Sequence, residues 1–182
     1  MKIGIVLSFF FILIACGSSK TRVAATAESR ALDELVAARA FMIESTWASP
    51  SATSSMNAIA NSGLLGNGNS AGNINLMGNP NFFKIEGDTI SADLPYFGER
   101  QMGGGYTSES GIKFKGVPDN VTIKKDDSTQ RYTMSFKISE AIEAYTIYIT
   151  LFPNWSSTMS INSTQRTSIN YKGEVIALPE KE

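Results

Sequence analysis

Apolar residues near the start of the chain recur at a helical period. Their spacing of three or four residues places them on one face of a helix, and the acidic residues fall elsewhere on the wheel. Thr26 or Ser29 is suited to cap the N-terminus of that helix. We therefore expect an amphipathic helix over residues 27–40 that covers a sheet. Its apolar positions are Leu32, Leu35, Val36 and Ala40.

From Phe41 onward the pattern changes to an alternation of apolar and polar residues, which is typical of half-buried strands. A first strand is predicted to reach Trp47, and Gly87 with Asp88 is predicted to form the turn of a hairpin. Later strands are predicted within residues 82–94, 111–116, 120–138, 144–152, 158–162 and 167–178. The charged residues from Lys124 to Asp127 are predicted to form a solvated turn within 120–138. The fold class is therefore α+β, mainly antiparallel β, with an N-terminal helix packed on a curled or barrel-like meander of about eight strands.

The interval between Glu44 and Lys84 contains no Asp, Glu, Lys or Arg and is crowded with Asn, Gly and Ser. Connections longer than about 15 residues without structure are uncommon and are either functional or disordered. We predict a flexible loop at about 49–73, with a binding or lid loop as the alternative. The loop would belong to a single globular domain over residues 27–182.

The N-terminus is predicted to carry a targeting signal. Lys2 precedes an apolar run from Ile3 to Ala15, which is too short to span a membrane, because a spanning helix needs about 20 residues. The stretch Leu-Ile-Ala-Cys that ends at Cys16 resembles the bacterial lipobox, in which the cysteine is acylated and becomes the new N-terminus. We predict a signal peptide at 1–15 and an acylated Cys16 with a tether at 16–26. The alternative is an ordinary signal peptide whose cleavage site adjoins a free cysteine.

The predicted lipid on Cys16 makes the membrane a partner of the chain. Gly17 occupies the position at which signals for inner-membrane retention usually carry Asp, so resemblance to sorted lipoproteins implies the outer membrane. We expect the periplasmic face. The cell surface is the alternative.

The amino-acid composition excludes several classes of catalytic and metal site. The chain has no histidine and a single cysteine, so histidine-dependent catalytic triads, imidazole catalysis, disulfides and histidine zinc sites are excluded. Loss of residues 1–15 removes one cation, Lys2, and leaves 15 basic and 17 acidic residues. A chain this close to neutral gives no electrostatic reason to bind nucleic acid. We predict no cofactor and no metal site.

The stretch LPYFGERQMGGGY, from Leu94 to Tyr106, contains the most distinctive local pattern. Proline lacks a ladder donor and belongs at a strand end, and Gly98 is predicted to take a positive φ that ends the strand. The glycine run lacks the lysine and the following helix of a phosphate loop. The stretch is thus predicted to be an architectural corner. If it binds a ligand, the candidate rim consists of Tyr96, Phe97, Arg100 and Tyr106.

Several of these motifs together resemble a family of uncharacterised bacterial envelope lipoproteins that is classed as a domain of unknown function. The resemblance covers Arg30 to Ile176, and its most specific parts are Asp93 to Gly98 and Gly111 to Phe114. The tail pattern is matched by Ser163, Arg166, Ile169, Tyr171, Gly173 and Val175. This resemblance implies no reaction, cofactor or catalytic residue.

These observations predict a non-enzymatic binding or interaction module that contacts an envelope protein or a small-molecule ligand. One alternative is a hydrolase of envelope glycan, because glycosidases need only two carboxylates about 5–10 Å apart and Asp93, Glu99 and Glu109 surround the motif. Another alternative is a structural subunit of a membrane assembly.

Overall fold

The computed structural model describes residues 22–101 and 111–179. The predicted signal peptide, Cys16, Tyr106 and Glu109 lie outside the described residues. None of the helices in these two ranges is long and apolar enough to cross a membrane.

The predicted N-terminal helix is confirmed as α2, Ala27–Ala38, but Ala40, which was predicted to be part of it, begins the strand that follows. Thr26 is its N-cap, and the Thr26 side chain accepts a hydrogen bond from the backbone N–H of Ser29 at 3.1 Å. The helix ends at Arg39, which takes a left-handed conformation with φ 50°. Leu32 and Val36 are buried, so one face of α2 packs on the sheet as its periodicity predicts.

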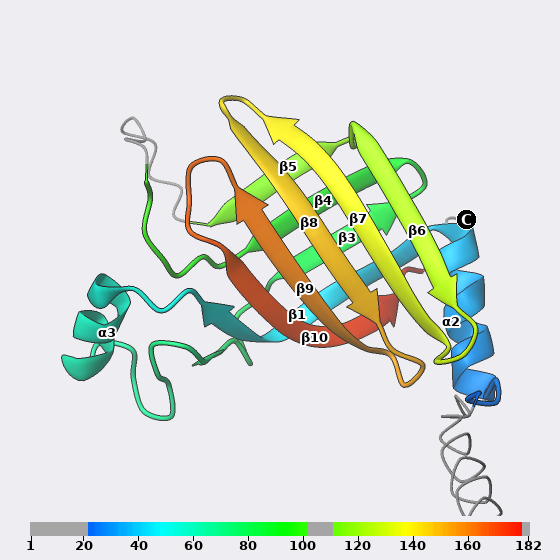
Figure 1. The fold of residues 1–182 in the computed structure, drawn as a ribbon, viewed down its shortest axis with the longest axis horizontal. Coiled ribbons are helices and arrows are strands. Elements are labelled where there is room, and N and C mark those ends of the chain that lie inside the picture. Colours follow the sequence, from blue (N-terminus) through cyan, green and yellow to red (C-terminus); the bar gives the residue numbers. More distant parts are fainter. Residues whose placement is uncertain (1–21, 102–110, 180–182) are drawn as a thin grey trace, which may run out of the picture.

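Within the described residues, ten strands form one antiparallel sheet, and two helices accompany it (Figure 1). The predicted hairpins are confirmed, with Gly87 at φ 64° in the turn between β3 and β4. The two-residue strand β2 was not predicted. The elements after α2 are β1 (Ala40–Pro50), α3 (Ser54–Asn61), β2 (Ile74–Asn75), β3 (Phe82–Glu86), β4 (Thr89–Leu94), β5 (Ile112–Gly116), β6 (Asn120–Asp126), β7 (Arg131–Glu140), β8 (Glu143–Leu151), β9 (Ser156–Ser163) and β10 (Ile169–Ala177).

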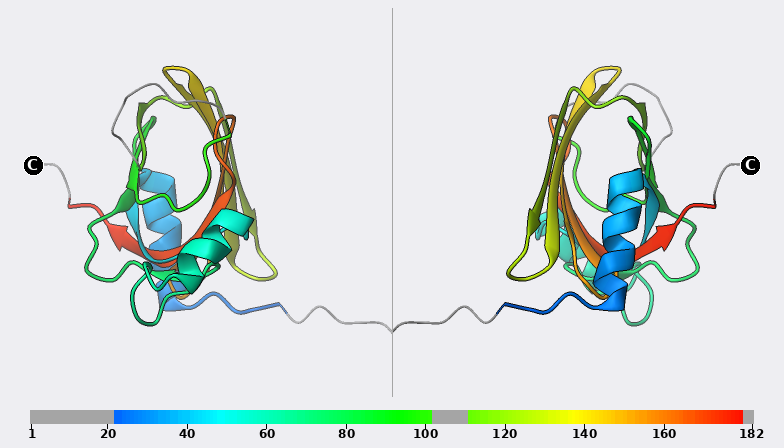
Figure 2. Two further views of the ribbon diagram at one scale, coloured as in Figure 1. Left: turned by 90° about the vertical axis from the view of Figure 1, so that its left-hand side faces the viewer. Right: turned by 90° about the vertical axis from the view of Figure 1, so that its right-hand side faces the viewer.

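The strand order is β5-β4-β3-β1-β10-β9-β8-β7-β6, with β2 beside β1. The first strand therefore pairs with the last, while β5 and β6, which follow each other in sequence, are the two edges. Figure 2 shows the sheet curling into a half-barrel, with β3–β5 facing β6–β9 and α2 at one end. The predicted curled meander is confirmed, with a closing pair, β1 and β10, that local patterns did not indicate.

Alternate residues of the strands fill the interior of the half-barrel. Phe83, Phe114, Phe136 and Tyr145 form an aromatic cluster, with ring centroids 5.3 to 6.4 Å apart for the contacting pairs. Burial of such a side chain contributes about 1.5–3 kcal/mol. The period-two pattern of the sequence thus gives the hydrophobic core directly.

The end covered by α2 contains a polar contact that differs from the prediction. The charged segment 124–127 was expected to be a solvated turn, but Lys125 and Asp126 belong to β6. Lys125 Nζ lies 2.7 Å from Asp33 Oδ2 of α2, and the Tyr132 hydroxyl donates to Asp33 Oδ1 at 2.7 Å. Lys125 has the same parity as the inward-leaning Ile123, which is why its side chain meets the helix.

The predicted loop at 49–73 begins within β1 and contains the helix α3. Thr53 caps α3 by accepting a hydrogen bond from the backbone N–H of Met56 at 3.2 Å, and Met56 is the buried residue of the helix. The sequence therefore encodes a short capped helix inside a segment whose composition indicated only a loop. In Figure 1, α3 lies at the end of the sheet opposite α2.

Candidate functional site

Residues 94–98, which we call the LPYFG segment, and the residues that follow them lie against the connection between β9 and β10. The backbone N–H of Gln101 donates to the carbonyl of Gln165 at 2.8 Å, and the N–H of Thr167 donates to the carbonyl of Glu99 at 3.1 Å. These contacts act as a short ladder between segments more than 60 residues apart. They bring together the two stretches, around Asp93 to Gly98 and at the tail, on which the family resemblance depends.

Tyr96 and Tyr171 fasten this contact. The Tyr171 hydroxyl donates to the carbonyl of Pro95 at 2.8 Å. The Tyr96 hydroxyl lies 2.9 Å from Thr167 Oγ1, 3.0 Å from the Thr167 carbonyl and 3.1 Å from the Glu99 carbonyl. Burial raises the pKa of the Tyr96 phenol above its usual value, although its hydrogen bonds to Thr167 oppose the shift. The hydroxyl of Tyr96 therefore stabilises the position of the LPYFG segment against the β9–β10 connection.

Gly98 serves a different purpose from the predicted one. Its φ is not positive, but a Cβ at this position would lie 2.5 Å from Tyr96 Oη and 2.7 Å from Thr167 Oγ1. Only glycine allows the backbone to come this close to the two hydroxyls. The predicted strand end at Pro95 is confirmed, because β4 ends at Leu94.

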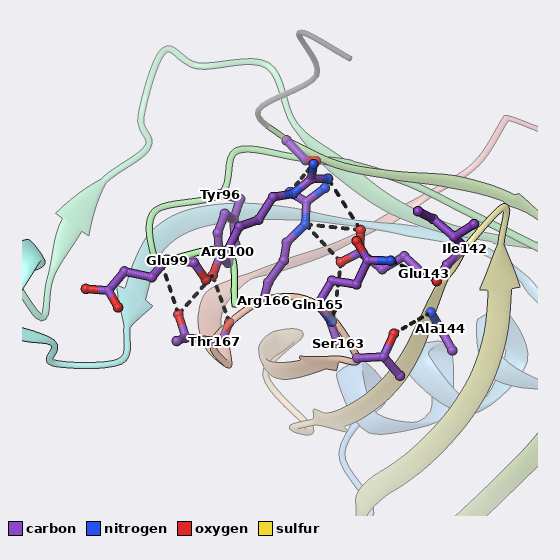
Figure 3. Close-up of polar contacts among 12 residues, drawn as sticks. Tyr96, Glu99, Arg100, Ile142, Glu143, Ala144, Ser163, Gln165, Arg166 and Thr167 are labelled. Carbon is purple, nitrogen blue, oxygen red and sulfur yellow. Dashed lines mark hydrogen bonds and ion pairs between the residues drawn. The ribbon is translucent and has the colours of Figure 1, made fainter. Parts of the chain in front are cut away.

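Glu143 and Arg166 form a buried ion pair beside this segment (Figure 3). Arg166 Nε donates to Glu143 Oε1 at 2.9 Å and to Oε2 at 3.2 Å, and the two side chains are only 5% and 8% exposed. The Ser163 hydroxyl also donates to Glu143 Oε1. A buried charge pair of this kind needs such additional hydrogen bonds to offset the loss of hydration.

Burial would raise the pKa of Glu143, but hydrogen bonds from Ser163, Arg166 and Tyr145 outweigh it and hold the pKa below its usual range. Burial, the largest cause, together with the hydrogen bond to Glu143 and the negative charge of Glu143, raises the pKa of the Tyr145 phenol, although the charges of Arg166 and Arg100 oppose the shift. Glu143 is consequently a carboxylate at neutral pH and a poor proton donor. The arrangement favours a fixed ion pair over general acid catalysis.

Arg166 also contacts the two motifs predicted from the sequence. Its Nη1 donates to the carbonyl of Gly111 at 2.8 Å, and its guanidinium carbon lies 5.2 Å from the centroid of the Tyr96 ring. One side chain thus links β8, the β9–β10 connection, the LPYFG segment and the start of β5. The fork of five donors in arginine suits this multiple contact, whereas lysine would supply one point charge.

The predicted rim residues occupy different environments. Arg100 Nη2 lies 3.6 Å from Glu143 Oε2, and the Arg100 side chain is 32% exposed, so it can face both the ion pair and solvent. Phe97 is half-buried and packs against the core with Tyr96. Tyr106 lies outside the described residues. The structure therefore brings Arg100 and Tyr96 to one cluster with Glu143 and Arg166.

Sequence reasoning missed Glu143, although a signal was present. Glu143 has the same parity as Tyr145, Ile147, Ile149 and Leu151, the four positions that alternate into the core. A carboxylate that continues an inward alternation requires a buried partner. Arg166 belongs to the tail pattern, but nothing in the local sequence shows that it meets Glu143.

The acids of the hydrolase hypothesis have separate partners. Asp93 Oδ2 lies 3.4 Å from Lys113 Nζ on the outside of the sheet. Hydrogen bonds from Ser55 and Thr53, at the N-terminus of α3, lower the pKa of Glu99 below its usual value. Glu109 lies outside the described residues. Glu99 thereby ties α3 to the LPYFG segment.

The described residues contain no group of three or more Cys, Asp or Glu side chains placed to hold a metal ion. The residues at the site are arginine, carboxylate, hydroxyl and amide groups that hydrogen-bond to one another. This arrangement can bind an external polar group through the exposed part of Arg100.

Residues 24–175 match the family model described as "Domain of unknown function (DUF4251)". The chain belongs to the DUF4251 family. The fold is similar to the crystal structure of a DUF4251 family protein from Bacteroides eggerthii DSM 20697, with a TM-score of 0.57 and 14% sequence identity. The alignment covers 84% of this chain and 89% of that one. No curated protein matches the chain.

Proposed function

We propose that this DUF4251 protein is a lipid-anchored, non-enzymatic binding module of the bacterial envelope that contacts its partner with the LPYFG end of the barrel. The observation that carries this proposal is the position of that end relative to the point where the chain enters the domain. The backbone N–H of Val23 donates to the Ser128 carbonyl at 2.9 Å, in the turn between β6 and β7. An anchor before residue 22 would therefore attach beside α2.

The LPYFG segment lies at the opposite end. The β9–β10 connection contacts it through backbone hydrogen bonds, and Arg100 beside the segment pairs with Glu143 at the β7–β8 turn. Consecutive turns of an antiparallel meander alternate between the two ends of the sheet. A domain tethered beside α2 would present these turns away from the membrane. Arg100 and the 79% exposed Ile142 would then meet a partner first.

The anchor itself rests on the sequence Leu-Ile-Ala-Cys before Gly17. Three acyl chains on the mature cysteine would give stable attachment, because each buried methylene contributes about 0.8 kcal/mol. The outer membrane is the proposed location, with the domain on the periplasmic face, and the cell surface is the alternative.

Lipid attachment is tested by labelling growing cells with an alkyne fatty acid. The full chain is expected to incorporate the label and to sediment with membranes. Cys16→Ala should abolish both, while the matched variant Ser18→Ala should leave both unchanged. Incorporation that persists in Cys16→Ala, or a mature protein with an unmodified thiol in mass spectrometry, would refute the anchor.

Partner contact is tested by photo-crosslinking of the full chain in cells. A benzoylphenylalanine residue replaces Ile142 at the LPYFG end or Asp88, 81% exposed, in the β3–β4 turn near the end of α2. We expect a discrete adduct only from position 142, and Arg100→Ala should weaken it. Equal adducts from both positions, or none from 142, would argue against this end as the binding surface. One stoichiometric protein partner would favour a structural subunit of an assembly.

A further inference from the structure

The outer face of β7–β10 contains a set of neutral polar side chains, which we call the neutral face. Ser135, Tyr148, Ser160 and Asn170 occupy successive strands in one cross-strand row, and Thr150 and Thr158 form the next row. Neighbouring strands are about 4.8 Å apart, and rows on one face are separated by two residues, or about 7 Å. These six residues thus form a continuous patch. In Figure 1 this side of the sheet is turned toward the viewer, and neither described helix crosses it.

The polar side chains of the neutral face are available for hydrogen bonds with an external molecule. None of the six side chains makes a hydrogen bond to any other part of the chain that the structure describes. The hydroxyl-rich connections elsewhere behave differently, since the side chains of Ser163, Thr164 and Thr167 all form internal hydrogen bonds. The face therefore offers four hydroxyls, one phenol and one amide to an external molecule.

Charge is confined to the border of this patch. Lys172 lies opposite Thr158 on β10, and Lys124 and Lys137 lie on the far side of it, on β6 and β7. The solvated face of an antiparallel sheet is ordinarily polar, but here its centre is polar without ions. A strongly anionic or cationic ligand would find no counter-charge over the centre.

Tyr148 provides an apolar surface in the middle of the row. Its side chain is 51% exposed, and it is the one aromatic residue among the exposed large hydrophobic residues of the described chain. Ser135 and Ser160 flank it on the neighbouring strands. A ring with a polar tip, set between hydroxyls, can stack on an apolar face while its neighbours hydrogen-bond the rim of the same molecule.

We propose that the neutral face binds a neutral polysaccharide. A pyranose ring combines an apolar face of C–H groups with hydroxyls at its edge, which matches an exposed tyrosine between serine, threonine and asparagine side chains. A protein partner fits less well, because interface cores are enriched in several aromatic, Met and Arg residues, and this patch has a single ring. This site is distinct from the LPYFG end and does not depend on the function proposed for that end.

The proposal is tested by native affinity electrophoresis of the detergent-solubilised full chain. The gels contain mannan, dextran, xylan or mixed-linkage β-glucan, with acidic polygalacturonate for comparison. At least one neutral polymer is expected to retard the protein. Tyr148→Ala should weaken the retardation about tenfold, whereas Tyr148→Phe should retain most of it because the ring is preserved.

Two further variants keep the result interpretable. Thr150→Glu places a charge in the neutral face and should also abolish retardation, while Leu64→Ala, at an exposed position outside this face, should not change it. Thermal melting of every variant checks that the fold is intact. The proposal is overturned if no neutral polymer retards the protein, if only polygalacturonate does, or if Tyr148→Ala and Thr150→Glu bind as the wild type does.

Discussion

Each end of the half-barrel contains a carboxylate, a cationic side chain and a tyrosine that lie together, but the two clusters differ in how deeply they are buried. At the α2 end, Asp33 contacts Lys125 and Tyr132, and the two charged side chains are 32% and 25% exposed. At the LPYFG end, Glu143 contacts Arg166 at 8% and 5% exposure, and it also receives a hydrogen bond from Tyr145. The pKa of each carboxyl is lowered, since hydrogen bonds outweigh the opposing effect of burial.

This difference in burial indicates how much each ion pair contributes to stability. A solvated pair can separate at little cost, because water replaces the lost partner. A buried pair cannot separate in this way, since the remaining charge stays unpaired in a medium of low polarity. We therefore expect the α2 pair to adjust how the helix sits on the sheet and the Glu143–Arg166 pair to decide whether the LPYFG segment is ordered.

The largest effect is expected from Arg166→Ala. This change removes the cation closest to the buried Glu143, so that Arg100 at 3.6 Å is the remaining one, and it also removes the donor to the Gly111 carbonyl. The free energy of unfolding should therefore fall by about 3–5 kcal/mol. Urea denaturation followed by tryptophan fluorescence measures the loss. The double variant Glu143→Leu/Arg166→Met should recover much of it, and a single change costing less than 1 kcal/mol would show that the pair is solvated.

Acid should expose the same difference without a mutation. Because the pKa of Glu143 is lowered in the folded state, its contribution is complete above the ordinary value of 4.5 and is lost as the pH falls through the lower, folded value. The unfolding free energy of the wild type should therefore drop below pH 4.5 more steeply than that of Glu143→Gln. The drop should be smaller than the effect of Arg166→Ala, because protonated Glu143 keeps hydrogen-bonding capacity. Parallel curves for the two proteins would contradict this assignment.

A smaller effect is expected from Tyr96→Phe. The ring and its contact with Arg166 remain, while the hydroxyl that binds Thr167 is lost, so the cost should be about 1 kcal/mol. Hydrogen exchange should show faster exchange at the amides of Gln101 and Thr167, which form the short ladder. Unchanged exchange at both amides would mean that the tyrosine hydroxyl does not hold the segment.

The smallest effect is expected from Lys125→Met at the α2 end, which should cost less than about 1 kcal/mol because its pair is partly solvated. Lys113→Met, which breaks the exposed pair with Asp93, is the matched control and should cost a similar amount. Thermal melting in low and high salt measures both. If Lys125→Met lowered stability as much as Arg166→Ala does, the proposed difference between the two ends would be wrong.

Much of the local structure could be predicted from the sequence. The helix over 27–40 was expected from its period and is α2, and the turn at Gly87 was expected from Gly-Asp between alternating residues. The alternating residues of β8 from Tyr145 to Leu151 share one face and are buried, as the alternation of apolar and polar residues predicts. The lipid anchor at Cys16 and the ligand rim remain predictions.

Other features could not be predicted, because they depend on which segments of the chain pack together. Lys125 was assigned to a solvated turn because its own segment is charged, and only the packing of α2 on β6 and β7 shows its partner Asp33. Gly98 was assigned a special φ, whereas the approach of Tyr96 and Thr167 is the reason that it is glycine. The composition of residues 49–73 gave no indication of α3, and Glu99, which contacts the N-terminus of this helix, follows Thr53 by more than 40 residues.

By itself, the sequence determined the repeating elements of this protein, because the period of a helix or strand is fixed by backbone geometry and is written residue by residue. Tertiary structure alone decided that β1 pairs with β10, that Glu143 meets Arg166, and that six neutral side chains from four strands form one face. Each of these outcomes depends on strand order and register, which arise from contacts between residues far apart in the chain. Those contacts leave no local pattern, apart from a charged residue such as Glu143 at a position that alternation directs into the core.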